Sequence, residues 1–173
     1  MTTYFLQKLA GKAFLAGLLT FSIHSISNAQ VFTGGNFGVN YDNNGVYVDL
    51  APEIGYRYKV VEVGIAPFVS YKQIDKAHHY SFGSRVFSRV TLYKDIFAHA
   101  EFQVTNIEIP GTVSSDIFFD NRKWIIAMPI GVGYRYKISK NITAQGSVLY
   151  DVLLDDDSPQ KNPIIRGGIV YDF

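Results

Sequence analysis

His79 and Ser81 are the residues whose types and spacing come nearest to a hydrolytic site. A histidine can take the proton of a serine hydroxyl and activate it as a nucleophile when a carboxylate orients the imidazole. Residues two apart lie on one face of a β-strand, so a strand beginning near His79 would place both side chains together. The alternative is a pair of polar residues at the rim of a strand. We take the rim pair as the main interpretation and keep the hydrolytic pair as the alternative.

His99 and Glu101 repeat this spacing, and Gln103 continues it. A histidine beside a carboxylate could relay a proton. The same pair could equally be a hydrogen-bonded interior pair near Arg85 or Arg89, and we favour that interpretation.

A metal site would require His78 and His79 to meet the acidic run of residues 155–157 from another connection. The run lacks the glycine and the distal glutamate of a calcium-binding loop. The chain has no cysteine, which excludes disulfides, thiolate metal sites and a thiol nucleophile. We therefore predict no metal site and no cofactor, and interpret the acidic run as a solvated, cation-attracting loop.

A period-two alternation of apolar and polar residues runs through the chain and predicts the elements that position these side chains. It divides the sequence into eight segments of strand-like pattern: 31–41, 46–58, 61–71, 79–93, 96–105, 124–136, 142–152 and 164–173. In the last one, Ile165, Ile169 and Tyr171 share a face, and Arg166 and Asp172 share the other. Charges are rare on the apolar faces, and no helical segment is available to cover them. This pattern predicts an all-β fold, an eight-stranded antiparallel up-and-down transmembrane β-barrel.

Charged residues recur on the opposite faces, where they would point into the barrel. The predicted lumen charge network is Glu53, Arg57, Arg85, Arg89, Glu101, Arg135 and Arg166. Such residues are costly in lipid but can pair with one another in a lumen. Eight strands leave an interior just wide enough for side chains to fill, so we expect salt bridges rather than an open pore.

A short sequence repeat marks one end of the predicted barrel. Residues 55–59, Gly-Tyr-Arg-Tyr-Lys, recur at 133–137, each time where a strand runs into a short connection. Aromatic rings at two-residue spacing are favoured at the membrane–water boundary. The predicted girdle is Tyr56, Tyr58, Tyr134, Tyr136, Tyr171 and Phe173. A soluble barrel of the lipocalin kind, with its apolar faces inward, is the alternative that periodicity alone leaves open, and the girdle argues against it.

The connections also alternate in length. Those after the second, fourth and sixth segments are short, whereas residues 72–78, 108–122 and 153–162 form longer polar stretches. Outer-membrane barrels have short periplasmic turns and longer external loops. We therefore expect both ends of the barrel chain on the periplasmic side, and surface interactions through 108–122 and 153–162.

The N-terminus has the pattern of a cleaved secretory signal. Lys8 and Lys12 precede an apolar run over 13–23, and Ser27-Asn28-Ala29 offers small residues for a peptidase. We predict a signal peptide at 1–29 and one barrel domain at 30–173. Cleavage would turn 16 basic residues into 14, against 15 acidic ones. A nearly neutral chain is not expected to bind nucleic acid.

The mature chain resembles, along its length, the small eight-stranded outer-membrane proteins of the OmpA and OmpX type from Gram-negative bacteria. The alternating last strand with Tyr171 and the terminal Phe173 looks like their assembly signal. The resemblance implies an outer-membrane location, contact with outer-membrane lipid, lipopolysaccharide and the barrel-assembly machinery, and a monomeric, porin-like but non-enzymatic structural or surface-interaction protein whose external ligand the sequence does not name. His79 and Ser81 resemble the pattern of outer-membrane lipid A deacylases, so a lipid A or phospholipid acyl-modifying enzyme is one alternative and a narrow channel is another.

Overall fold

The computed structural model describes residues 29–42, 45–74, 77–108, 122–155 and 158–173. Its strands are β1 (Ala29–Asp42), β2 (Gly45–Tyr58), β3 (Val61–Ile74), β4 (Ala77–Tyr93), β5 (Ile96–Glu108), β6 (Arg122–Ala127), β7 (Pro129–Lys137), β8 (Ile142–Asp151) and β9 (Ile164–Asp172). Within these ranges no helix is long and apolar enough to cross a membrane. The predicted signal peptide lies outside the described residues except for Ala29, where β1 begins.

β6 and β7 are two halves of one strand, interrupted at Met128. Gln103 of β5 pairs with Ala127, and Ala100 pairs with Ile130, so the register continues unchanged across the gap. Pro129 has no N–H to give to the ladder, and the Met128 N–H donates instead to Asp151 Oδ1 at 2.9 Å. The wall therefore contains eight strands, which confirms the predicted number.

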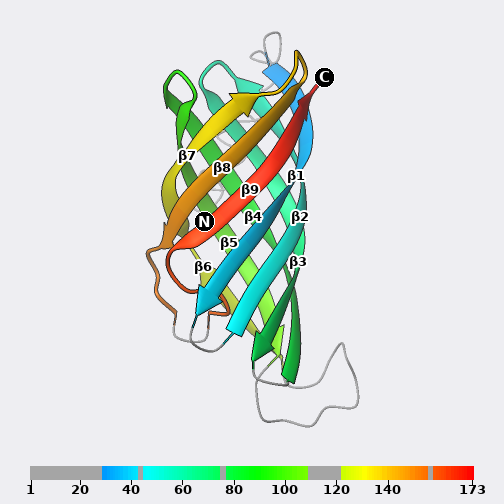
Figure 1. Cartoon of the computed structure of the whole chain (residues 1–173), viewed down its shortest axis with the longest axis vertical. Coiled ribbons are helices and arrows are strands. Elements are labelled where there is room, and N and C mark those ends of the chain that lie inside the picture. The colour runs from blue at the N-terminus through cyan, green and yellow to red at the C-terminus, as the bar shows by residue number, and fades with distance from the viewer. Residues whose placement is uncertain (1–28, 43–44, 75–76, 109–121, 156–157) are drawn as a thin grey trace, which may run out of the picture.

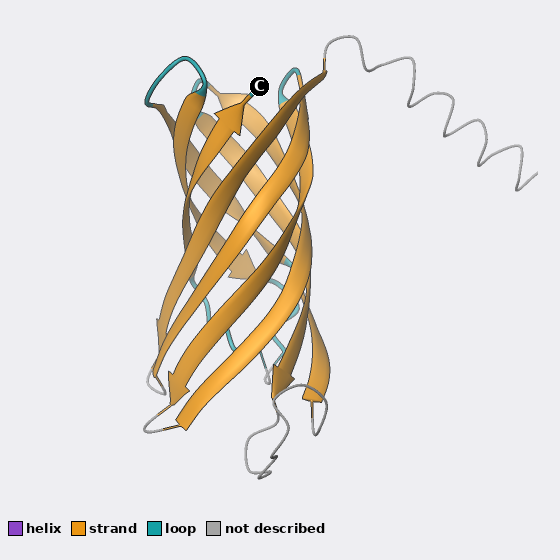
Figure 2. Cartoon of the chain, turned by 90° about the vertical axis from the view of Figure 1, so that its right-hand side faces the viewer, coloured by secondary structure: helices purple, strands orange, loops and turns teal. Residues whose placement is uncertain are grey.

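The sheet is antiparallel throughout and closes on itself, because β1 pairs with both β2 and β9 and β4 pairs with β5. The stagger of the barrel is ten residues. If the cross-strand partners are followed once around the wall from Ala29, they return to β1 at Val39. A stagger of this kind requires tilted strands, and the tilt is plain in Figures 1 and 2.

The two ends of the barrel differ. The turn end has the short connections β2–β3, β4–β5 and β7–β8, together with the start of β1 and the end of β9. The loop end has the connections β1–β2, β3–β4, β5–β6 and β8–β9. Figure 1 shows the end of β9 at the top, at the turn end.

The predicted long connection at 72–78 is wrong. β3 continues to Ile74 and β4 starts at Ala77, so that Lys72 pairs with His79 and Gln73 with His78. These polar residues extend the strands at the rim instead of forming a loop, because a strand that projects beyond the bilayer no longer needs an apolar face. Of the other two predicted loops, 109–121 and 156–157 lie outside the described residues.

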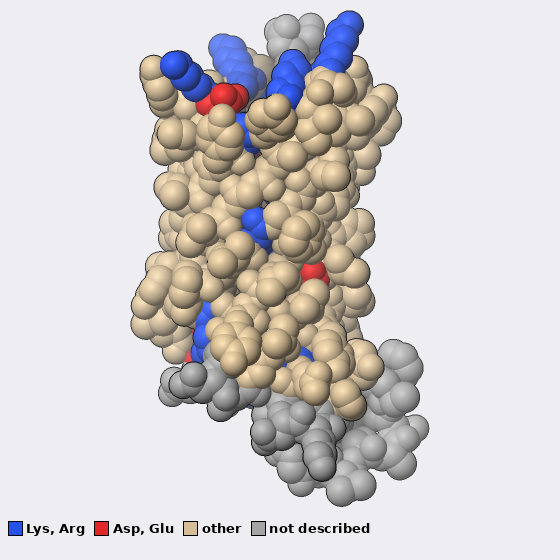
Figure 3. Space-filling model, in the orientation of Figure 1, with Lys and Arg blue, Asp and Glu red and all other residues tan. Residues whose placement is uncertain are grey.

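The wall has the reverse of a soluble protein's burial pattern. Ile54, Val86 and Val132 are each more than half exposed, while Glu53 and Arg85 are exposed by 2% or less. Figure 3 shows a flank almost without charged side chains between the two ends. An apolar exterior around a charged interior is stable only where lipid replaces water outside. The barrel is therefore a transmembrane one, and the soluble alternative is excluded.

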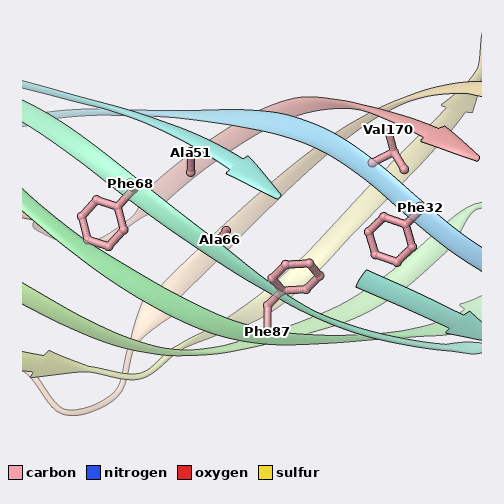
Figure 4. Close-up of a cluster of buried hydrophobic side chains, with 6 residues drawn as sticks. All are labelled: Phe32, Ala51, Ala66, Phe68, Phe87 and Val170. Carbon is pink, nitrogen blue, oxygen red and sulfur yellow. The ribbon is translucent and has the colours of Figure 1, made fainter. Parts of the chain in front are cut away.

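Four inward phenylalanines each pair across the sheet with a glycine. The pairs are Phe32–Gly55, Phe87–Gly64, Phe68–Gly83 and Phe97–Gly133. A Cβ added at any of these glycines would lie within 2.6 Å of the paired ring. Each ring thus covers the backbone of its glycine. Figure 4 shows three of these rings inside the barrel with their small neighbours: Phe32, Phe68, Phe87, Ala51, Ala66 and Val170.

Candidate functional site

The lumen holds a network of ion pairs, and its part nearest the turn end is centred on Glu62 of β3. Arg57 Nε lies 2.6 Å from Glu62 Oε1, and Arg135 Nη2 lies 2.8 Å from Glu62 Oε2. Arg57 Nη1 also lies 2.6 Å from Asp172 Oδ1. Since these residues come from β2, β3, β7 and β9, the cluster joins opposite walls of the barrel.

Glu53 of β2 is the centre of the next layer. Arg89 from β4 donates to both of its oxygens, at 3.1 Å to Oε1 and 2.7 Å to Oε2. Asn36 Nδ2 donates to Oε2 at 2.8 Å and Gln145 Nε2 to Oε1 at 3.2 Å. A bidentate contact with arginine is the strong geometry for a buried carboxylate. The negative charge of Glu53 is therefore neutralised inside the lumen.

Arg166 of β9 organises the layer nearest the loop end. Its Nη1 lies 2.9 Å from Asp49 Oδ2 and its Nη2 lies 3.0 Å from Glu101 Oε2. Arg85 also pairs with Asp49, and its Nη1 lies 3.7 Å from Glu101 Oε2. His99 Nε2 lies 3.2 Å from Glu101 Oε1. Two arginines therefore share two carboxylates in the buried interior.

The structure places all seven residues of the predicted lumen set in this network. The set omits Asp49, Glu62 and Asp172, which carry much of the pairing. Charge balance could have found them: the predicted set has five arginines and two glutamates, and a low-dielectric interior does not tolerate such an excess. Alternation alone already assigns Asp49 and Asp172 to inward faces.

Four of the arginines stack on the phenylalanines that cover glycine. The guanidinium carbon lies 4.2 Å from the ring centre in Arg89–Phe87, and 4.5, 4.8 and 5.5 Å in Arg135–Phe97, Arg85–Phe68 and Arg57–Phe32. Such contacts are attractive because the ring face is negative. We call these units the Gly–Phe–Arg stacks.

The β8–β9 connection closes the loop end of the lumen. Gln160 is buried, donates to Tyr47 Oη at 2.8 Å, and accepts from Arg166 Nη2 at 3.4 Å. Asn40 Nδ2 donates to the Pro163 carbonyl at 2.7 Å. The predicted surface loop 153–162 is therefore only partly a surface: from Ser158 onward it covers the mouth. A cavity of about 10 Å³ among lumen residues of the middle layers has room for about one water molecule.

His79 and Ser81 lie on the lumen face of β4 near its loop end. Ser81 is buried, and its carbonyl accepts a 3.3 Å hydrogen bond from Ser70 Oγ of the neighbouring strand. His79 is half-buried. The pair thus faces the interior of the barrel, away from the lipid-facing wall.

His99 and Glu101 form a buried interior pair, each less than 5% exposed. Glu101 also forms ion pairs with Arg166 and Arg85, so its negative charge takes part in the structural network of the lumen. This arrangement matches the interior-pair interpretation better than a proton relay, which needs access to water.

Within the described residues no group of three or more metal-ligating side chains is assembled. His78 lies on the exposed rim with its Nδ1 at 2.6 Å from Tyr71 Oη. Asp156 and Asp157 of the acidic run are outside the described residues, so the structure does not address their part of that site.

The six predicted girdle residues all lie at the turn end and are exposed on the outer wall. Tyr171 and Phe173 meet edge to face with ring centres 5.2 Å apart. A second set of exposed aromatic residues, beyond the predicted girdle, lies at the loop end: Tyr41, Tyr80, Trp124 and Tyr150. Two aromatic belts therefore bracket the apolar wall, as expected at the two surfaces of a membrane.

No family model and no curated protein sequence matches the chain. Among solved structures it is similar to Neisserial surface protein A, with 13% identity over 85% of this chain and 98% of that one, at a TM-score of 0.45. It is also similar to a de novo designed transmembrane β-barrel, with 15% identity over 83% of this chain and 95% of that one, at a TM-score of 0.40. The closed wall of eight strands, the inverted burial and the aromatic belts make this chain a small eight-stranded transmembrane β-barrel.

Proposed function

We propose that this protein is a non-enzymatic, non-conducting barrel of the bacterial outer membrane, with a structural or surface-interaction role exercised from its loop end. Its partners on this proposal are outer-membrane lipid, lipopolysaccharide and the barrel-assembly machinery, and it acts as a monomer. The cleaved signal at 1–29 and the terminal aromatic pair of β9 would direct it there.

The observation that carries the proposal is the filled lumen. Arginines and carboxylates from different strands lie 2.6–3.0 Å apart in three successive layers, and the segment beginning at Ser158 covers the loop end. Opening a path for ions would separate buried opposite charges, which costs several kcal/mol for each broken pair. A channel would have to break these ion pairs each time an ion passed. A closed barrel is therefore the better interpretation.

Planar-bilayer recording of the refolded protein tests this directly. We expect no stepwise current from the wild type. The double variant Glu53→Ala/Arg89→Ala removes both members of one pair and leaves space, so it serves as the control that the assay registers an opened lumen. Steady single-channel steps from the wild type would favour the narrow channel instead. Density-gradient fractionation of Gram-negative cells expressing the full chain tests the outer-membrane location.

The acyl-modifying enzyme remains the alternative in the enzymatic class, with His79 and Ser81 as its residues. Their lumen-facing position supports the non-enzymatic proposal, because lipid chains meet the outer wall. Mass spectrometry of lipopolysaccharide and phospholipid incubated with the refolded barrel distinguishes the two. Released or transferred acyl chains that disappear in His79→Ala would establish the enzyme.

A further inference from the structure

A shallow apolar groove lies on the outer wall beneath the β2–β3 turn. It has a volume of about 370 Å³ and is lined by Ile54 and Tyr56 of β2, Val63 and Ile65 of β3, and Val86 of β4, with Gly55 and Gly64 between them. Tyr56 pairs with Val63 and Ile54 with Ile65, so the lining side chains form two rows across neighbouring strands. The groove is thus part of the lipid-facing wall itself.

Two lysines stand at the turn end above this groove. Lys59 begins the β2–β3 turn and Lys94 begins the β4–β5 turn, and both side chains are exposed. Each ammonium lies over the ring of the preceding tyrosine, at 5.3 Å for Lys59 on Tyr58 and 5.2 Å for Lys94 on Tyr93. The β2–β3 turn is joined to β4, because the Thr91 N–H donates to the Val60 carbonyl at 2.8 Å, and Lys94 follows Thr91 three residues later.

The depth of the groove suits an acyl chain whose headgroup lies at these lysines. Tyr56 and Ile54 are three and five residues from Lys59, about 10 and 17 Å along the strand at roughly 3.3 Å per residue. One leaflet of hydrocarbon is about 15 Å deep, and the strand is tilted. A lipid with its phosphate at the level of Lys59 would therefore lay its upper chain in the groove.

From the groove and the lysines above it we infer a binding site for one anionic glycerophospholipid, with the phosphate between Lys59 and Lys94 and an acyl chain against β2–β4. The charge of the site is complementary to a phosphate, although Asp95 beside Lys94 offsets part of it. This inference rests on the membrane-spanning fold and is independent of whether the lumen conducts or the protein catalyses a reaction.

The β7–β8 turn provides a matched control. Two further exposed lysines lie there, Lys137 at the end of β7 and Lys140 in the turn. Figure 3 shows several basic side chains at this end of the barrel. Simple attraction to an anionic membrane surface would make the two lysine pairs equally important. A site above the groove makes only Lys59 and Lys94 important.

The test is native mass spectrometry of the barrel released from nanodiscs of equal parts phosphatidylglycerol and phosphatidylcholine. We expect the wild type to retain one phosphatidylglycerol in preference to phosphatidylcholine. Each of Lys59→Gln and Lys94→Gln should reduce retention about fivefold, the usual effect of one basic residue at an anionic surface. Lys137→Gln/Lys140→Gln should leave retention unchanged. Equal losses in the two pairs, or no preference in the wild type, would overturn the site.

A second pair of variants tests the groove. Val63→Phe fills it, and Val132→Phe makes the same change on the wall of β7; both residues are exposed to lipid, so each barrel should fold. We expect Val63→Phe alone to reduce retention of both lipids. The same retention in the two variants would refute the role of the groove. Preferential capture of added lipopolysaccharide over phosphatidylglycerol would refute the lipid class.

Discussion

Gly64→Ala tests the Gly–Phe–Arg stacks. A Cβ at position 64 would lie 2.5 Å from Phe87 Cζ and 2.6 Å from the Ile54 carbonyl oxygen. The carbonyl belongs to the β-ladder and cannot move without distorting it, so the Phe87 ring must shift as well. Because Arg89 stacks on that ring at 4.2 Å, the displacement also disturbs the pairing of Arg89 with Glu53.

The expected net effect is a destabilisation of about 1–3 kcal/mol. Overpacking a filled interior costs about 1–3 kcal/mol, and the loss of a desolvated cation–π contact adds about 1 kcal/mol. Alanine is intrinsically better than glycine in a strand by about 0.5–1 kcal/mol, which offsets part of this cost. Gly146→Ala is the matched control, since the nearest atom to its added Cβ is the Arg166 carbonyl oxygen at 3.8 Å.

Urea unfolding of the barrel in lipid vesicles measures both variants. Trp124 is the only tryptophan in the chain and lies exposed on the outer wall, so its emission reports its transfer from lipid to water. We expect Gly64→Ala to unfold at lower urea than the wild type and Gly146→Ala at equal or higher urea. Coincident transitions for the two variants would refute the idea that these glycines are required by the rings that cover them.

Three further predictions concern the wall, the lumen and the last strand. Val132→Arg puts a charge on the lipid face and should destabilise the barrel by about 2–4 kcal/mol, whereas Val132→Leu should not, as vesicle unfolding would show. Arg89→Ala alone leaves the buried Glu53 charge unpaired and should cost about 3–5 kcal/mol, more than Arg89→Ala combined with Glu53→Ala; a costlier double variant would contradict this. Phe173→Ser should lower the folded fraction in the outer membrane, measured by heat-dependent gel mobility, while Phe173→Tyr should not; normal levels of the serine variant would count against the terminal signal.

The strands and the two faces of each could be predicted because period two is a local property. In β2, Leu50 and Ile54 alternate with Asp49 and Glu53, and the structure places the first pair outside and the second inside. Among the described strands, local pattern was misleading where polarity changes for another reason. Lys72 and His78 extend β3 and β4 at the rim, where a polar strand and a polar loop have the same composition.

The partners in the lumen could not be predicted in the same way. Arg57 meets Asp172 across 115 positions of sequence, and Arg166 meets Asp49 across 117. Which inward residues share a layer depends on the closure of the barrel and on its ten-residue stagger, and neither can be deduced from the alternation of one strand. The covering of the mouth by Gln160 depends on the same closure, because Tyr47 and Arg166 come from separate strands.

The Gly–Phe–Arg stacks explain how so narrow a barrel holds large apolar and charged side chains together. Because glycine has no side chain, the paired phenylalanine ring can lie directly against its backbone. This cross-strand arrangement is known to stabilise glycine in sheets. The face of the ring that points away from the glycine then contacts the flat face of a guanidinium. The N–H groups of the guanidinium lie in its own plane and stay available to a carboxylate. Arg89 shows the result, with Phe87 against its face and both Glu53 oxygens at its edge. Since one arginine contacts the ring and the carboxylate at once, large apolar and charged side chains can share one layer of the lumen.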